Sequence, residues 1–146
     1  MRLPGSVLFA CNHNAIRSPI AAALLRHLHG RRTFVDSVGV RALPIDPFAV
    51  AVMEEFGIDL RNHVPKSFED LEDLSFDLVI SLTAEAQHSA VELTRSMACD
   101  VEFWPSLDPT VFEGNRAEIL ASYRGLRDRL WVRVQERFPA TPQGQV

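Results

Sequence analysis

The chain has 146 residues, of which 47% are apolar and 23% are charged, and its formal net charge is −4. This length and composition predict one soluble globular domain over residues 1–138, followed by a short flexible tail at 139–146. No apolar stretch is long enough to span a bilayer, and no basic run exceeds two residues, so neither a membrane nor a nucleic acid is an expected partner. Two cysteines do not make a disulfide framework, and the first residues lack a signal-peptide core, so we expect a cytoplasmic protein.

The first half of the chain predicts two strands and two helices. Residues 7–10 form a short continuous apolar run, which is typical of a strand buried on both faces. Ser18 and Pro19 then open a helix predicted over 19–29, because serine is a good N-cap and proline is tolerated at the first helical position. A β-branched and aromatic stretch predicts a second strand over 33–38, and Asp46 with Pro47 caps a helix predicted over 47–56.

The second half continues the alternation of strands and helices. Its predicted elements are a short turn of helix from Ser67, a third strand at 77–82, a helix at 83–95, a fourth strand at 101–104 and a long helix at 116–138. This alternation predicts an α/β fold with a four-stranded parallel sheet in the order 2-1-3-4 and helices on both faces. Ligands bind such folds at the switch point of the strand order, which here lies beside the first strand.

A short loop at that switch point carries the strongest functional signal. The first strand ends at Cys11, and Arg17 and Ser18 follow after five residues, namely Asn12, His13, Asn14, Ala15 and Ile16. We call residues 12–17 the oxyanion loop, because a loop of this length before a helix N-terminus directs backbone N–H groups into a concavity that binds a tetrahedral anion. Asn12, His13 and Asn14 are residue types that tolerate the left-handed backbone angles such a loop needs.

The same pattern predicts nucleophilic chemistry at Cys11. A helix N-terminus and a neighbouring arginine favour the thiolate form, which is the nucleophile. Arg17 is suited to holding two phosphate oxygens, and the Ser18 hydroxyl can donate to the sulfur and ease its later departure. Taken singly, a cysteine such as Cys11 is more often a small, inert, buried residue at a strand end, and Arg17 is a surface charge. The joint pattern of strand, cysteine, gap, arginine, serine and helix favours the oxyanion site.

Residues 7–22 resemble the start of the low-molecular-weight protein tyrosine phosphatases and of the thiol-dependent arsenate reductases that share their fold. The resemblance covers roughly residues 5–137 and is sharp in the loop 11–19, the Ser37-Val38-Gly39 turn and the Asp108-Pro109 pair. It implies the flavodoxin-like phosphatase I fold and a reaction without a cofactor or metal. It also implies that Cys11 attacks phosphorus, that Arg17 binds the phosphoryl oxygens, and that the Asp-Pro loop supplies the general acid.

The resemblance also implies two residues that support the loop. In the family, a serine at the turn that ends the second strand hydrogen-bonds to the asparagine of the loop, and a histidine after a Gly-Ile-Asp turn joins them. Ser37, Asn14 and His63 stand at these positions. The alternatives are a serine that bonds within its own turn and an ordinary surface histidine.

Asp108 is the predicted proton donor. It follows the fourth strand, at the same edge of the sheet as the oxyanion loop. A protonated Asp108 can neutralise the leaving oxygen and then act as base for the water that cleaves the thiophosphate. A bound phosphate dianion is expected to raise the pKa of Asp108 by like-charge repulsion. The alternative is an aspartate that only initiates a turn.

Three departures from the family's pattern leave the substrate open. His13 stands where glycine is usual, Ile16 where many members carry a second, protective cysteine, and Thr110 and Val111 replace aromatic residues that stack on phosphotyrosine. The predicted function is hydrolysis of a phosphomonoester, on a phosphorylated protein or as a small phosphate ester, through a cysteinyl-phosphate intermediate. Phosphotyrosine is only weakly supported as the substrate.

Two other functions stay open at this stage. Arsenate mimics phosphate, so the same loop suits an arsenate reductase. The segment 81–86 holds no cysteine and Cys99 is the only other thiol, so such a reductase would use an external small thiol. The third option is a non-catalytic module that senses phosphate or a similar oxyanion.

Overall fold

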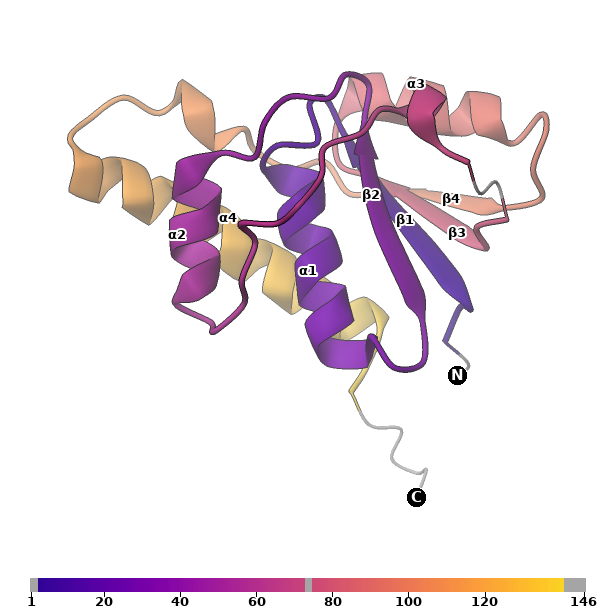
Figure 1. The fold of residues 1–146 in the computed structure, drawn as a ribbon, viewed down its shortest axis with the longest axis horizontal. Coiled ribbons are helices and arrows are strands. Elements are labelled where there is room, and N and C mark those ends of the chain that lie inside the picture. Colours follow the sequence, from indigo (N-terminus) through magenta and orange to yellow (C-terminus); the bar gives the residue numbers. More distant parts are fainter. Residues whose placement is uncertain (1–2, 73–74, 141–146) are drawn as a thin grey trace.

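A computed structural model describes residues 3–72 and 75–140, and it confirms the predicted fold class. Its strands are β1 (Ser6–Cys11), β2 (Phe34–Gly39), β3 (Leu78–Ser81) and β4 (Asp100–Phe103). They form one parallel sheet in the order β2-β1-β3-β4, as predicted (Figure 1). The tail expected at 139–146 lies outside the described residues from position 141 onward.

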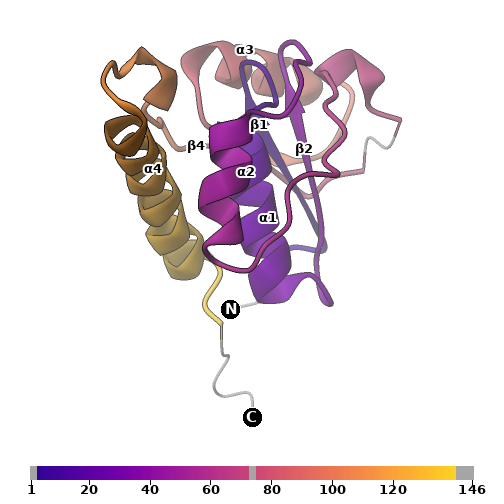
Figure 2. The ribbon, with the colours of Figure 1, turned by 60° about the vertical axis from the view of Figure 1, so that its left-hand side comes forward.

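Helices cover both faces of this sheet, again as predicted (Figures 1 and 2). They are α1 (Arg17–His29), α2 (Pro47–Glu54), α3 (Ala84–Leu93) and α4 (Arg116–Arg137). Side chains alternate along the central strand β1: Val7 and Phe9 belong to the core shared with α1, α2 and α4, and Leu8 and Ala10 to the core shared with α3. Within the described residues, no helix is long and apolar enough to cross a membrane.

The start of α1 differs from the prediction. Ser18 is not the N-cap, because the helix begins at Arg17, its N-cap is Ile16, and no side chain caps it. Ser18 is fully buried instead, and its hydroxyl lies beside Cys11 and Asn14. The first N–H groups of α1 are therefore not satisfied by a capping side chain, which suits a helix that binds an anion at its N-terminus.

Asp46 caps α2 as predicted, Thr83 caps α3, and both residues also contact the oxyanion loop. Asp46 accepts hydrogen bonds from Phe48 and Ala49 N–H, and its own N–H donates to the Ala15 carbonyl at 3.1 Å. Thr83 caps α3, and its hydroxyl donates to the Asn12 side-chain oxygen at 2.7 Å. The two helices thus begin at the loop that the sequence analysis singled out.

Candidate active site

The carbonyl groups at the oxyanion loop accept hydrogen bonds from other segments of the chain, whereas its backbone N–H groups are unpaired among the described residues. The carbonyls of Cys11, Asn12, His13 and Ala15 accept backbone hydrogen bonds of 2.8–3.1 Å from Val40, Arg41, Leu43 and Asp46. By contrast, the backbone N–H groups of residues 12–16 have no hydrogen-bond partner among the described residues. Backbone donors that the fold leaves unpaired are available to an anion.

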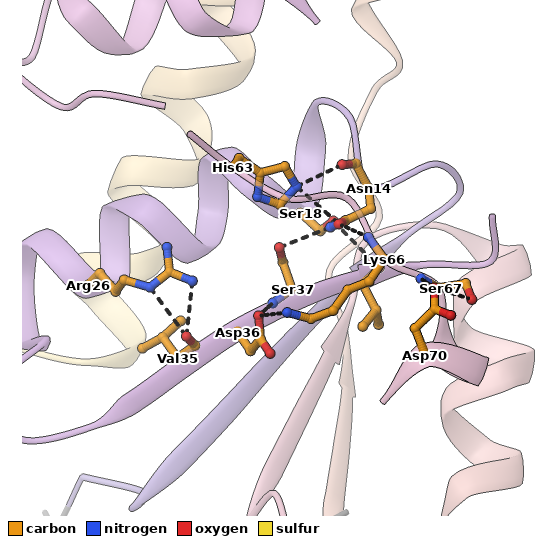
Figure 3. Close-up of polar contacts among 11 residues, drawn as sticks. Asn14, Ser18, Arg26, Val35, Asp36, Ser37, His63, Lys66, Ser67 and Asp70 are labelled. Carbon is orange, nitrogen blue, oxygen red and sulfur yellow. Dashed lines mark hydrogen bonds and ion pairs between the residues drawn. The ribbon is translucent and has the colours of Figure 1, made fainter. Parts of the chain in front are cut away.

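Asn14 holds the shape of the loop (Figure 3). Its φ of 54° is the one left-handed value among the described non-glycine residues, so Asn12 and His13 do not adopt the left-handed angles that the sequence allowed. The buried Asn14 amide donates to Ser18 Oγ and to Ser37 Oγ, both at 2.9 Å. Its oxygen accepts from Lys66 N–H at 2.9 Å and lies 3.0 Å from His63 Nε2. Every donor and acceptor of this amide is therefore used.

His63 acts as a hydrogen-bond donor in this network. Its Nε2 lies 3.1 Å from the Asn14 carbonyl and 3.0 Å from the Asn14 side-chain oxygen, and both of these atoms only accept. Burial is the main influence that lowers the pKa of His63, and the charges of Arg26 and Lys66 lower it further. The lowered pKa favours the neutral ring, and the two acceptors beside it place its proton on Nε2.

We expect Asn14→Ala to destabilise the protein by about 2–4 kcal/mol, because two buried and two half-buried partners lose a hydrogen bond and alanine tolerates a φ near 54° less well than asparagine. Urea unfolding measures this change in the free energy of unfolding. Asn62→Ala is the matched control, since Asn62 is exposed. Equal stability of the two variants would contradict the role of Asn14.

Gly39 explains why the loop lies so close to the end of β2. A Cβ at Gly39 would sit 2.5 Å from the Asn14 backbone nitrogen and 2.4 Å from the Arg41 carbonyl oxygen. Only glycine permits this approach, which brings the Ser37-Val38-Gly39 turn against the loop.

Cys11 lines the cavity beside the loop, and its sulfur has two donors of Ser18 beside it. The sulfur is 3.0 Å from Ser18 Oγ, and it accepts from Ser18 N–H at 3.4 Å. The Ser18 hydroxyl also lies within donating distance of the Val38 carbonyl, at 3.1 Å. Because a hydroxyl has one proton, it can donate to Val38 beside a thiol and rotate to the sulfur beside a thiolate.

Arg17 and Asp108 lie around the same small cavity. This cavity has a volume of about 70 Å³ and is lined by Cys11, His13, Ala15, Ile16, Arg17, Asp108 and Thr110. Arg17 Nη1 donates to the Ser106 carbonyl at 3.0 Å, so the loop after β4 holds the guanidinium in place. Its remaining N–H groups are available to bind two oxygens of an anion.

Thr110 donates two hydrogen bonds to the carboxylate of Asp108. Asp108 Oδ1 accepts from Thr110 N–H at 2.9 Å and from the Thr110 hydroxyl at 2.6 Å. Burial acts to raise the pKa of Asp108, but these two hydrogen bonds and the nearby charges of Arg17 and His13 outweigh it, so the net pKa is lowered. The protein's own groups therefore favour the ionised form, and the protonated form depends on the charge of a bound anion.

We expect Thr110→Val to raise the pKa of Asp108, because the variant removes one donor to the carboxylate and keeps the branched side-chain shape. A titration of the Asp108 carboxyl carbon by NMR measures the shift. Thr110→Ser is the control, since it retains the hydroxyl and should leave the pKa of Asp108 at its wild-type value. An unchanged pKa in Thr110→Val would show that the hydroxyl does not influence the carboxylate.

The second cysteine lies apart from this cavity. Cys99 is half-buried, and it packs on the core around α3. Burial, and to a lesser degree the charge of Asp100, raises the pKa of this thiol. Ile16 lines the cavity where a protective cysteine is usual in the resembled family, so the described cavity contains a single thiol.

Fold and loop together define a class of protein: a parallel α/β protein that brings one thiol, one arginine and unpaired N–H groups to the switch point of its sheet. The chain belongs to the low molecular weight phosphotyrosine protein phosphatase family, whose sequence model matches residues 6–136.

Individual relatives include both phosphatases and reductases. The chain is 30% identical over 120 residues to a glutaredoxin arsenate reductase of Synechocystis sp., covering 82% of this chain and 87% of the relative. Among solved structures, the low molecular weight protein tyrosine phosphatase of T. tengcongensis is 26% identical with a TM-score of 0.73, covering 90% and 96% of the two chains. The Erwinia amylovora tyrosine phosphatase AmsI has a TM-score of 0.76 over 96% and 95%, and at 19% identity it shows the fold alone.

Proposed function

We propose that this protein hydrolyses phosphomonoesters by transferring the phosphoryl group first to Cys11 and then to water. The observation that carries this proposal is that residues 12–16 leave their N–H groups unpaired among the described residues, and that the loop brings Cys11 and Arg17 to one small cavity. Such donors stabilise the negative charge that develops on the phosphoryl oxygens. Family membership supports the same activity.

In the first step, Cys11 Sγ attacks phosphorus and the phosphorus–oxygen ester bond breaks. Asp108 gives its proton to the leaving oxygen, which departs as an alcohol or phenol. Oδ1 of Asp108 is occupied by the two Thr110 donors, so Oδ2 is the oxygen that carries this proton.

In the second step, water attacks the phosphorus of the cysteinyl phosphate. Asp108, now a carboxylate, accepts a proton from this water. The sulfur–phosphorus bond breaks, and the Ser18 hydroxyl and N–H stabilise the departing thiolate. Phosphate is released and the original protonation states are restored.

The proposed substrates are a phosphorylated protein or a small phosphate ester. A cavity of about 70 Å³ accommodates a phosphoryl group, whereas sites that enclose a whole small molecule measure roughly 300–1,000 Å³. None of its seven lining residues is Phe, Tyr or Trp, so the cavity supports no particular preference for phosphotyrosine. We place the protein in the cytoplasm, because the mechanism needs Cys11 reduced.

A second candidate function is arsenate reduction with an external small thiol. The similarity to the glutaredoxin arsenate reductase of Synechocystis favours it. No second thiol lines the cavity, so the reducing thiol would have to come from outside the protein. Asp108 distinguishes the two functions, since only ester hydrolysis has an organic leaving group to protonate.

The test compares both activities in one reduced preparation, with EDTA present. Release of nitrophenol from p-nitrophenyl phosphate reports phosphatase activity, and arsenite formation from arsenate with glutathione and glutaredoxin reports reductase activity. We expect turnover of the phosphate ester and little arsenite. Arsenite formation without ester hydrolysis would replace our proposal with the reductase, and phosphate binding without either activity would favour an oxyanion sensor.

A further inference from the structure

An apolar groove adjoins the phosphate cavity, between the loop after β4 and the helix α4. Two adjoining hollows, of about 300 and about 280 Å³, share Leu107, Leu126 and Arg129 among their lining residues. Asp108 lines both the second hollow and the phosphate cavity, so groove and cavity meet at the proposed general acid. We call this feature the α4 groove.

The loop side of the α4 groove exposes large apolar side chains. Leu107 is 70% exposed, Val111 is 76% exposed and Phe112 is 46% exposed. Three such side chains within six residues, beside a hollow, form a contiguous apolar surface, which on soluble proteins commonly marks a binding site.

The helix side of the α4 groove carries two cations without a carboxylate partner. Arg129 and Arg133 are exposed and four residues apart on α4, so they lie on the same side of the helix. Neither forms an ion pair with a carboxylate in the part of the chain that the structure describes. The Arg133 guanidinium lies 4.9 Å from the centre of the Trp104 ring, which helps to hold it beside the groove. Two unpaired cations on a protein with net charge −4 indicate an anionic partner.

The small size of the phosphate cavity indicates that the rest of the substrate is recognised outside it. Because that cavity accommodates only the phosphoryl group, selectivity among phosphate esters must come from contacts outside it. The α4 groove is an apolar and cationic surface that begins at the reacting atoms. From Leu126 to Arg133 it follows α4 for about 10 Å, a length that about three extended residues span.

We propose that the α4 groove binds the residues next to the phosphorylated residue of a protein substrate, and that it selects apolar and acidic side chains there. An apolar side chain packs against Leu107 and Val111, and an acidic side chain pairs with Arg129 or Arg133. This inference rests on the proposed phosphatase function and specifies its substrate class as phosphoproteins.

The test uses phosphotyrosine peptides whose three flanking residues, on one side or the other, contain leucine with glutamate, glycine with glutamate, or leucine with lysine. We expect kcat/KM to fall about tenfold when glycine replaces leucine, and about three- to tenfold when lysine replaces glutamate. The Arg129→Glu variant should reverse the preference between glutamate and lysine. Its kcat/KM for p-nitrophenyl phosphate, which has no flanking residues to occupy the groove, should stay within about twofold of the wild type.

Arg31→Glu is the matched control, since Arg31 is an exposed arginine just beyond the other end of α1. It should keep the wild-type order of the three peptides. Equal turnover of all three peptides by the wild type would overturn the proposal, as would an Arg129→Glu variant that retains the preference for glutamate. Hydrolysis of p-nitrophenyl phosphate without peptide selectivity would reject the groove and leave the proposed phosphatase function intact.

Binding measurements test peptide recognition by the groove independently of turnover. Calorimetry of the same peptides with the Cys11→Ser variant should give the same order of affinity. The difference in affinity between the glutamate and lysine peptides should become smaller as the salt concentration is raised. Light scattering tests the alternative that a second copy of the chain occupies the groove. A concentration-dependent dimer that disappears in Arg129→Glu, together with no peptide preference, would assign the groove to self-association and overturn the proposal.

Discussion

The Cys11→Ser variant is expected to lose at least about 10⁴-fold in turnover of p-nitrophenyl phosphate while it still binds phosphate. The serine hydroxyl is not ionised at neutral pH and is therefore a poor nucleophile. The binding groups remain, because Arg17 is anchored by the Ser106 carbonyl and the loop by Asn14, neither of which depends on the sulfur. Steady-state kinetics and phosphate titration by calorimetry measure the two effects separately.

Cys99→Ser serves as the control for this prediction. Cys99 is half-buried, and it does not line the phosphate cavity. We expect unchanged kinetics in this variant. Residual turnover in Cys11→Ser close to the wild-type rate would show that the reaction does not pass through the cysteine.

The Asp108→Asn variant is expected to discriminate between substrates by their leaving groups. For an alkyl phosphate, whose leaving oxygen is strongly basic, we expect a loss of about 10²–10⁴-fold, because the amide cannot give up a proton. For p-nitrophenyl phosphate, whose leaving group departs without full protonation, the loss in the first step should be much smaller. A plot of log kcat/KM against leaving-group pKa should therefore be steeper for the variant.

Asp59→Asn is the matched control for Asp108, because Asp59 is exposed and its carboxylate pairs with the neighbouring Arg61, away from the cavity. This control should give the wild-type slope. An Asp108→Asn variant that slows good and poor leaving groups by the same factor would argue that Asp108 positions the substrate and does not protonate the leaving group.

Sequence patterns were sufficient to predict the fold because they are repeated along the chain. The alternation of short apolar runs with helical periodicity predicted the parallel sheet and its order, and most element bounds agree within about two residues. The N-cap role of Ser18 was wrong because capping propensity is local, whereas buried contacts with Cys11 and Asn14 determine where this hydroxyl lies. That residues 1–138 form a single domain remains a prediction.

The candidate site was predicted in part, by spacing and by resemblance. The gap between Cys11 and Arg17 indicated the loop, and the position after β4 indicated Asp108. No pattern in the sequence indicated that Asp46, Thr83 and Lys66 also hold the loop, since these contacts join segments far apart in the chain. Nor did it indicate that Thr110 binds Asp108, because any residue two positions after an aspartate could have pointed elsewhere.

The most direct test of the central claim is to trap the intermediate. Rapid acid quenching during turnover of p-nitrophenyl phosphate, followed by peptide mass spectrometry, shows which residue carries the phosphoryl group. Our account predicts one phosphoryl group on Cys11, together with a burst of nitrophenol that matches the enzyme concentration. Turnover at full rate with no phosphoryl group on Cys11, or with one on another residue, would contradict it.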